Sequence, residues 1–293
     1  MNQQLAFLGL GVMGGPMSAN LARAGYSVKG WNRTPDRPGV EVAIAGGVEI
    51  VSSIAEAVAT ADVVFSCVGD VPDVEEVLCA PGGVTDFARP GTLVVDMSTI
   101  GPRSARAIYQ TLEEKKLRFV DAPVSGGDIG AQQGTLTIMV GAREADFQEC
   151  LPLFQIMGKS IHLCGPVGSG QGVKLCNQVL CSANTLGLCE AIKLAQQQQI
   201  DPNLIVEVCS GGAAGSWVLS NLGPKITTSD FAPGFAIKHI LKDLRLVLEM
   251  MEAEQLPGTE LANRYFQAVS VLDNGSGEEL GTQAMMKVYD ATR

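Results

Sequence analysis

The sequence predicts an α/β protein in which an N-terminal doubly wound parallel sheet is followed by an all-α C-terminal domain. Short apolar runs alternate with helical patterns until Gly165, and after Gly172 the chain has helical patterns almost throughout. Aromatic residues make up only 5% of the 293 residues, whereas glycine occurs 34 times, which suits a tightly turned α/β protein better than an aromatic-rich β-sandwich. The change of pattern predicts a first domain over residues 1–166 and a second over 167–293.

The elements of the first domain follow from apolar runs and their spacing. Short segments of four to eight residues, most of them rich in apolar residues, predict strands over 5–8, 26–31, 61–68, 92–96, 118–122, 136–140 and 160–164. Apolar residues at helical spacing, Met17, Leu21 and Ala24, predict a helix directly after the first strand. Further helices are expected over 53–59, with Ser52 or Ser53 as N-cap, and over 73–79, 102–116 and 144–157.

The second domain is expected to be built from helices alone. Asp201-Pro202 and Leu256-Pro257-Gly258 interrupt the helical pattern, because proline ends helices and glycine favours turns. The expected helices cover 172–199, 202–209, 234–254, 258–272 and 279–292.

Composition and charge exclude several functional classes. The net charge of −10 disfavours nucleic acid and anionic membrane surfaces as partners. No apolar run reaches the ~18 residues of a membrane span, and no basic start precedes an unbroken apolar segment, so we expect a cytoplasmic protein. The eight cysteines form no C-x-x-C pair and are expected as reduced core thiols. With only His162 and His239 as imidazoles, both expected to be structural, we expect no metal site.

A glycine-rich turn follows the first strand and opens a helix. Gly9, Gly11 and Gly14 fit G-x-G-x-x-G, with Val12 and Met13 between them. The first glycine permits the tight turn, the second lets the backbone approach a pyrophosphate, and the third permits close helix–sheet packing. In this context the pattern predicts a dinucleotide-binding domain of the Rossmann type rather than a turn without ligand.

The end of the second strand indicates which dinucleotide binds. Asn32-Arg33-Thr34 stands where an NAD enzyme usually carries an acidic residue for the ribose 2′-hydroxyl. Arg33 can bind a 2′-phosphate through its planar fork, and Asn32 and Thr34 can donate hydrogen bonds. The sequence therefore predicts NADP(H); the alternative is that Arg33 is a solvated turn residue.

Four ordered motifs resemble the β-hydroxyacid dehydrogenase family over nearly the whole chain. The run from Phe7 to Leu21 is similar to the family's N-terminal signature, and Asp121 to Gly141 to its substrate-binding motif. Gly168 to Asn177 resembles its catalytic motif, and Lys242-Asp243 its cofactor-side lysine. The segment Asp230 to Leu246 is similar to the glyoxylate/succinic semialdehyde reductase branch, apart from Ala236, where that branch has proline.

The resemblance implies that Lys174 is the catalytic acid and Asn177 its partner. The sequence around Lys174 is consistent with this role. Lys174 is the first charge in an otherwise uncharged helix start, and desolvation there lowers a lysine pKa toward neutral pH. Asn177 lies three residues on and therefore on the same helical face. The alternatives are a surface lysine and an ordinary polar packing residue.

Other residues are expected around the two ligands. Ser125, Gly126 and Gly127 offer a hydroxyl and backbone N–H groups to a substrate carboxylate, unless they form only a structural turn. Val68 ends the third expected strand and Thr99 follows the fourth, where α/β sheets bind ligands. Both are expected at the cofactor, Val68 at the nicotinamide and Thr99 at its ribose or at the substrate. By resemblance Lys242 reaches the cofactor, and Phe231 and Asp243 border the substrate; the alternative is a solvated charged face.

The sequence therefore predicts NADPH-dependent reduction of a small anionic aldehyde or keto acid, succinic semialdehyde or glyoxylate, to the hydroxy acid. The alternatives are a 3-hydroxyisobutyrate or tartronate semialdehyde dehydrogenase, an imine reductase, and a non-catalytic NADP-binding sensor. Sensors and imine reductases usually lack the lysine that this chain has at position 174. The helix expected over 172–199 is long and has few charges, and together with the family resemblance it predicts a homodimer or homotetramer.

Overall fold

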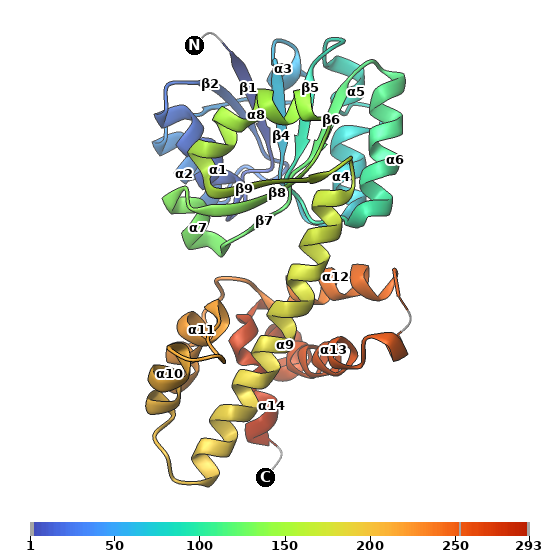
Figure 1. Cartoon of the computed structure of the whole chain (residues 1–293). Coiled ribbons are helices and arrows are strands. Elements are labelled where there is room, and N and C mark those ends of the chain that lie inside the picture. The colour runs from blue at the N-terminus through green and yellow to red at the C-terminus, as the bar shows by residue number, and fades with distance from the viewer. Residues whose placement is uncertain (1–2, 252, 292–293) are drawn as a thin grey trace. The chain divides into compact units, whose positions relative to one another are not determined.

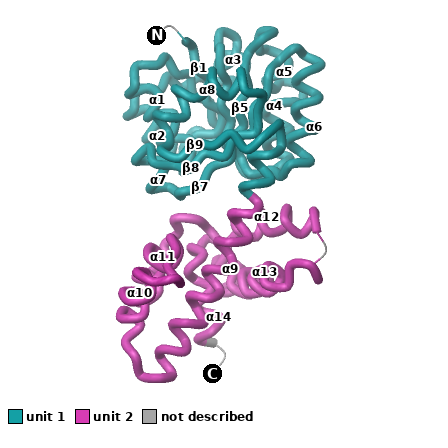
Figure 2. Tube along the Cα trace, viewed as in Figure 1, with its two compact units in different colours: residues 1–174 teal, residues 175–293 magenta. Residues whose placement is uncertain are grey.

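The structure is a computed structural model that describes residues 3–251 and 253–291. The chain forms two compact units, Met1–Lys174 and Leu175–Arg293 (Figure 2). Unit 1 contains a sheet with helices on both faces, and unit 2 is helical (Figure 1). The predicted fold class, a doubly wound sheet followed by an all-α domain, is confirmed.

The sheet of unit 1 has nine strands in the described part of the chain. They are β1 (Gln4–Leu8), β2 (Ser27–Trp31), β3 (Glu49–Ile50), β4 (Val63–Ser66), β5 (Leu93–Asp96), β6 (Arg118–Asp121), β7 (Val124–Ser125), β8 (Leu136–Gly141) and β9 (Gly158–Gly165). Their order is β3-β2-β1-β4-β5-β6-β8-β7, with β9 pairing β8. The first six strands are parallel, and β8 runs antiparallel to β6 and β7. The order reverses beside β1, which is where such sheets bind ligands.

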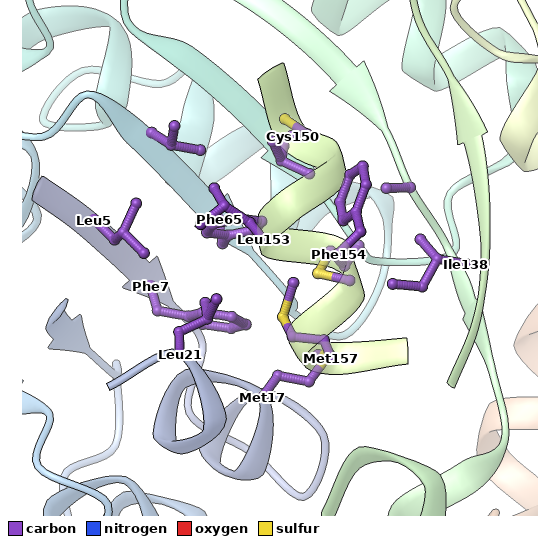
Figure 3. Close-up of a cluster of buried hydrophobic side chains, with 14 of the residues drawn as sticks. Leu5, Phe7, Met17, Leu21, Phe65, Ile138, Cys150, Leu153, Phe154 and Met157 are labelled. Atoms are coloured by element: carbon purple, nitrogen blue, oxygen red, sulfur yellow. The ribbon is translucent and has the colours of Figure 1, made fainter. Parts of the chain in front are cut away.

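Alternating side chains of each strand feed two cores, one on each face of the sheet. Leu5 and Phe7 of β1 join one cluster, and Ala6 and Leu8 join the other. The first cluster packs α1 (Gly14–Arg23), α2 (Pro38–Ala45) and α8 (Glu144–Met157), and Figure 3 shows α8 side chains facing Phe7 and Phe65. The second packs α3 (Ile54–Val58), α4 (Val71–Leu78) and α6 (Gly101–Glu114). Short helices α5 (Val84–Phe87) and α7 (Gly127–Gln133) complete the unit.

Unit 2 surrounds a third core, which includes Leu188, Ile192, Ile240 and Phe266. Its helices are α9 (Ser169–Gln197), which begins in unit 1, α10 (Pro202–Ser210), α11 (Trp217–Thr227), α12 (Ile237–Leu248), α13 (Pro257–Ser270) and α14 (Met286–Ala291). Short 3-10 segments lie at Ala253–Gln255, Leu272–Glu279 and Thr282–Met285. None of the helices in the described ranges is both long and apolar enough to cross a bilayer.

The structure differs from the expected elements where local signals are short or interrupted. Helices α2, α5, α7 and α11 and the two-residue strands β3 and β7 were not predicted. The helix expected over 234–254 is only α12, because Ala236 is extended and bridges Gly281. The helix expected over 279–292 begins at Met286, because Leu280 and Gly281 are extended and Thr282–Met285 forms a 3-10 turn.

Candidate active site

The glycine-rich turn joins β1 to α1, and two of its glycines cannot carry a side chain. Gly9 has φ +93°, and a Cβ there would lie 2.7 Å from Val68 Cγ1 and even closer to the Cys67 carbonyl oxygen. A Cβ on Gly14 would overlap the Gly9 carbonyl oxygen, so α1 begins directly against the strand end. A Cβ on Gly11 would meet no atom within 4 Å, so the backbone there borders open space.

The start of α1 fits a dinucleotide pyrophosphate. Met13 occupies the N-cap position, and no side chain accepts a capping hydrogen bond there. Val12 beside it is 66% exposed. The start of α1 lies at the positive end of the helix dipole, which attracts anions. In its first turn the N–H groups of Gly15 and Met17 donate to the carbonyls of Gly11 and Met13, and Pro16 has no N–H group. Together with the open space at Gly11, this arrangement fits the phosphates of a nicotinamide dinucleotide.

The segment after β2 is fixed against this turn. Asn32 Oδ1 accepts from the Leu10 N–H at 2.8 Å, and Asn32 Nδ2 donates to the Thr34 carbonyl at 2.5 Å. Asn32 therefore braces the glycine-rich turn and shapes its own loop. Arg33 is 64% exposed, and its Nη1 lies 3.0 Å from Asp73 and 3.1 Å from Glu76 of α4. Arg33 is therefore not a purely solvated residue, since two carboxylates orient its guanidinium.

A buried carboxylate links the ends of β4 and β5. Asp96 is fully buried, and its Oδ1 accepts from the Ser66 hydroxyl at 2.8 Å and the Ser98 hydroxyl at 2.7 Å. Ser98 Oγ in turn accepts from the Val68 N–H at 3.0 Å. Val68 and Thr99 thereby lie at the carboxyl edge of the sheet, and Val68 is beside Gly9 of the glycine-rich turn. Asp96 was not predicted as a site residue. The sequence signal that could have identified it is an acidic residue at the end of an apolar strand.

A second buried carboxylate, Asp121, ends β6 and anchors the start of α9. Its Oδ1 accepts from the Gly168 N–H at 2.6 Å and its Oδ2 from the Gln171 N–H at 2.9 Å. Burial raises the pKa of Asp121 to about 6, the two backbone hydrogen bonds oppose the rise, and nearby Asp96 adds to it. Neither Asp121 nor Gln171 was assigned a role from the sequence.

Lys174 and Asn177 lie on α9, one turn apart. Lys174 is only 6% exposed and lies one turn beyond Gln171. Since Gln171 is bonded to the end of β6, Lys174 belongs to the same edge of the sheet as the glycine-rich turn. Asn177 Nδ2 donates to Gln178 Oε1 at 2.8 Å, within unit 2. A buried ammonium in the turn that follows this anchored helix start can serve as a proton donor.

The turn after β7 supplies backbone donors at the same edge of unit 1. Ser125 ends β7, and Gly126 and Gly127 follow with φ +134° and +65°, so both positions favour glycine. This conformation leads directly into α7, with Asp128 in its first turn. The turn can present N–H groups and the Ser125 hydroxyl to an anion.

In unit 2 a polar chain connects α9 with α12. The Gln178 amide nitrogen donates to Asp243 Oδ2 at 2.6 Å, and Asp243 Oδ1 lies 2.9 Å from Lys242 Nζ. Gln178 and Asp243 are buried, so this link is shielded from water. Lys242 also lines a pocket of about 510 Å³ formed by α12 and α13. The structure thus brings Asn177, Lys242 and Asp243 into one network, joined by Gln178, which no sequence pattern marks.

Phe231 is held by the segment that precedes α14. The buried amide of Gln283 donates to the carbonyls of Asp230 and Ala232 at 3.1 and 3.0 Å, on either side of Phe231. Lys287 Nζ lies 5.2 Å from the centroid of the Phe231 ring. Phe231 also packs against the core of unit 2 that contains Ile240 and Leu244 of α12.

The two histidines have local contacts of their own. His162 lies on β9 with Nε2 2.8 Å from the Ser160 hydroxyl, and burial together with Lys242 and Lys238 lowers the pKa of His239. Within residues 3–251 and 253–291, no three His, Cys, Asp or Glu side chains are grouped so that they could hold a metal ion.

Comparison with known proteins agrees with this architecture. Residues 4–165 match the family described as the NAD binding domain of 6-phosphogluconate dehydrogenase. Residues 168–289 match the family described as NAD-binding of NADP-dependent 3-hydroxyisobutyrate dehydrogenase.

Individual relatives cover almost the whole chain. An uncharacterized oxidoreductase of Synechocystis sp. is 50% identical over 98% of both chains. The 2-hydroxy-3-oxopropionate reductase of Escherichia coli is 36% identical over 98% of this chain and 97% of its own. The structure of Mycobacterium tuberculosis 3-hydroxyisobutyrate dehydrogenase with L-serine is 32% identical, with a TM-score of 0.86 over 99% of each chain.

Proposed function

The chain belongs to the β-hydroxyacid dehydrogenase family, and we propose that it is the NADPH-dependent reductase of a small carboxylated aldehyde. As a member it is an oxidoreductase that acts on CH–OH groups with a nicotinamide dinucleotide. The proposed substrate is succinic semialdehyde or glyoxylate, which becomes the corresponding hydroxy acid. Residues 1–166 are the proposed cofactor domain and residues 167–293 the substrate and dimerisation domain.

The preference for NADPH rests on the loop after β2. Arg33 offers a guanidinium for the 2′-phosphate, and the loop 32–34 contains no carboxylate that would select the 2′-hydroxyl instead. Asp73 and Glu76 both bind the same guanidinium nitrogen, Nη1, so Arg33 can turn its other edge to a phosphate. Thr34 completes the proposed 2′-phosphate site with its hydroxyl, and Asn32 shapes the loop.

Buried Lys174 is the observation that carries the proposed reaction. The reduced nicotinamide, when bound, supplies the hydride for the carbonyl carbon. Lys174 Nζ donates a proton to the carbonyl oxygen, so that negative charge does not accumulate on it. Asn177 orients the substrate beside Lys174. The product gains one hydride and one proton and is therefore an alcohol.

The remaining residues would bind and orient the ligands. The Ser125-Gly126-Gly127 turn would hold the substrate carboxylate through N–H groups and the hydroxyl. Val68 would line the nicotinamide pocket, Thr99 would bind the adjoining ribose or the substrate, and Lys242 would contact the cofactor. Phe231 and Asp243 would border the substrate.

A spectrophotometric assay tests the substrate and the cofactor together. Purified protein is mixed with NADPH or NADH and with succinic semialdehyde, glyoxylate, methylmalonate semialdehyde or tartronate semialdehyde, and loss of absorbance is followed. We expect the highest kcat/KM with NADPH and one of the first two aldehydes. A preference for NADH, or four inactive aldehydes despite NADPH binding, would contradict the proposal.

The same assay decides between this proposal and its alternatives. The relatives named for 2-hydroxy-3-oxopropionate and 3-hydroxyisobutyrate favour tartronate semialdehyde and methylmalonate semialdehyde as alternative substrates. These aldehydes differ by few atoms, and such differences are worth only about 1–3 kcal/mol each in a pocket. A sensor without catalysis would bind NADPH and reduce none of them.

The exposed face of α9 supports assembly into a homodimer or homotetramer. Val173, Leu180 and Leu194 are 43%, 64% and 61% exposed, and they recur at helical spacing. The exposed residues between them are Cys176, Ala183, Asn184, Gly187, Glu190 and Ala191, and of these only Glu190 is charged. A second copy of the chain that packs on this face would remove its apolar surface from water.

A further inference from the structure

Gln171 connects the start of α9 to the loop that contains Thr99. Its side chain is fully buried, and Oε1 accepts from the Ile100 N–H at 2.9 Å and the Gly101 N–H at 3.1 Å. Its Nε2 donates to the Ser98 carbonyl at 2.8 Å. The three bonds bracket Thr99 on both sides. They also satisfy two N–H groups at the start of α6, where the side chain of the Ile100 N-cap cannot do so.

Asp121 fixes the backbone from which Gln171 extends. Its two carboxylate oxygens bind the N–H groups of Gly168 and Gln171, and it is paired in register with Asp96 of the neighbouring strand. Asp96 in turn holds Ser98. One buried hydrogen-bond network therefore joins the ends of β5 and β6, the loop 98–101 and the first turn of α9.

We propose that Gln171, supported by Asp121, is a positioning residue that holds the Lys174 turn of α9 in fixed register with the Thr99 loop. The inference deepens the proposed function, because it rests on Lys174 as proton donor and Thr99 as ligand contact. A lysine ammonium stands on a flexible four-carbon stem, so it is well placed only where its backbone is fixed. Misplacement of about 1 Å costs about 100-fold in rate.

The first test substitutes Gln171→Met, which keeps the length and removes all three hydrogen bonds. We expect kcat to fall about 10- to 100-fold while KM for the aldehyde changes by less than about threefold. The matched control is Thr92→Val, which removes a buried hydrogen bond to the Ala61 carbonyl at the opposite end of β5. The control is expected to lower stability and leave kcat unchanged. An equal loss of kcat in both variants, or none in Gln171→Met, overturns the inference.

The second test uses Gln171→Glu as a rescue that depends on pH. Only the protonated carboxyl can both accept from Ile100 and Gly101 and donate to the Ser98 carbonyl. The kcat of this variant relative to wild type is therefore expected to be highest at pH 5.5 and to fall as pH rises to 8. A ratio that is constant over this range contradicts the inference, because the donated hydrogen bond would then have no effect on the rate.

A third measurement needs no turnover. Amide hydrogen exchange of the protein without cofactor is expected to be faster in Gln171→Met than in wild type at residues 98–101 and 172–176, and unchanged there in Thr92→Val. Unchanged exchange in Gln171→Met overturns the inference, whether or not wild type reduces an aldehyde. A wild type that reduces no aldehyde would reject the proposed function alone. Conversely, loss of activity in Lys174→Ala with normal kcat in Gln171→Met would leave the proposed function intact and reject the inference.

Discussion

At the residue scale, two carboxylates are buried at the carboxyl edge of the sheet, where the proposed active site lies. Asp96 and Asp121 are neighbours in register at the ends of the parallel strands β5 and β6. A buried carboxylate is costly unless hydrogen bonds compensate for lost water, and each of these accepts at least two. Their hydrogen-bond partners lie in the loop after β5 and at the start of α9, which are parts of the proposed active site. The two buried carboxylates therefore hold these segments in place.

The pKa of Asp121 predicts a pH dependence of stability. Because burial raises it from 3.8 to about 6, the folded state holds a proton that the unfolded state has lost between these pH values. The contribution of Asp121 to stability is therefore complete below pH 3.8 and is lost as pH rises through 6. Between pH 5 and pH 7.5, wild type should lose about 1–2 kcal/mol relative to Asp121→Asn. Urea unfolding of both proteins at the two pH values measures this; a constant difference would contradict it.

Arg33 predicts the cofactor preference. Arg33→Ala would remove the proposed charge-assisted hydrogen bond to the 2′-phosphate. Such a bond is worth about 1.5–3 kcal/mol, so the Kd for NADPH is expected to rise about 10- to 100-fold. The Kd for NADH, which has no 2′-phosphate, should change by less than about twofold. Fluorescence titration with each dinucleotide measures both constants, with Arg23→Ala at the end of α1 as control. An equal rise of the Kd for NADPH and for NADH would show that Arg33 does not bind the 2′-phosphate.

At the element scale, the long periodic segments could be predicted from the sequence and the short ones could not. The strands of unit 1 other than β3 and β7, and the helices α6, α8 and α9, were expected from the residue pattern of their own segments. Helix α7 has two glycines and no apolar stripe, and α11 contains Pro224, so local propensity argued against both. Their structure depends on tertiary contacts, such as the Asn20 amide that donates to the Ala131 carbonyl at 2.9 Å.

The same limit applies to the proposed site. Glycine spacing and the strand-end position predicted the nucleotide-binding turn, because these signals are local. The network of Asp121, Gln171 and Ser98 joins residues more than 20 positions apart, and no local pattern marks such partners. Asp243 was expected at the substrate, and its contact with Gln178 places it in a network that the sequence did not reveal.

The cap of α3 predicts a measurable contribution to stability. Ser53 Oγ accepts from the Glu56 N–H at 3.2 Å, so Ser53 and not Ser52 is the N-cap. Ser53→Ala should lower the free energy of unfolding by about 1 kcal/mol. Ser52→Ala, which removes only an exposed hydroxyl bonded to the Glu56 carboxylate, should cost less than about 0.5 kcal/mol. Urea unfolding compares the two, and equal losses would argue against the cap.

At the scale of the whole molecule, α9 belongs to both units. Its first residues carry Gln171 and Lys174 in unit 1, and the helix continues through unit 2, where Leu188 and Ile192 enter the core. The proposed proton donor and two residues of the helical core therefore lie on one continuous helix. The exposed apolar residues on the same helix place the proposed interface between copies on this element too.

That interface can be tested by charge. Leu180→Glu places a carboxylate in the middle of the exposed face of α9, where burial against a second copy would be unfavourable. We expect this variant to sediment as a monomer and wild type as a dimer or tetramer in analytical ultracentrifugation. Gln110→Glu on the exposed face of α6 is the control and should not change the mass. A monomeric wild type, or an unchanged Leu180→Glu assembly, would contradict the proposed interface.

The central claim is that Lys174 donates the proton in an NADPH-dependent reduction. Single-turnover reduction of succinic semialdehyde and of glyoxylate by prebound NADPH should be at least about 100-fold slower in Lys174→Ala than in wild type, with the NADPH Kd unchanged. Lys193→Ala, on the same helix and paired with Asp290, should react at the wild-type rate. A Lys174→Ala variant that reduces either aldehyde at the wild-type rate would contradict the claim.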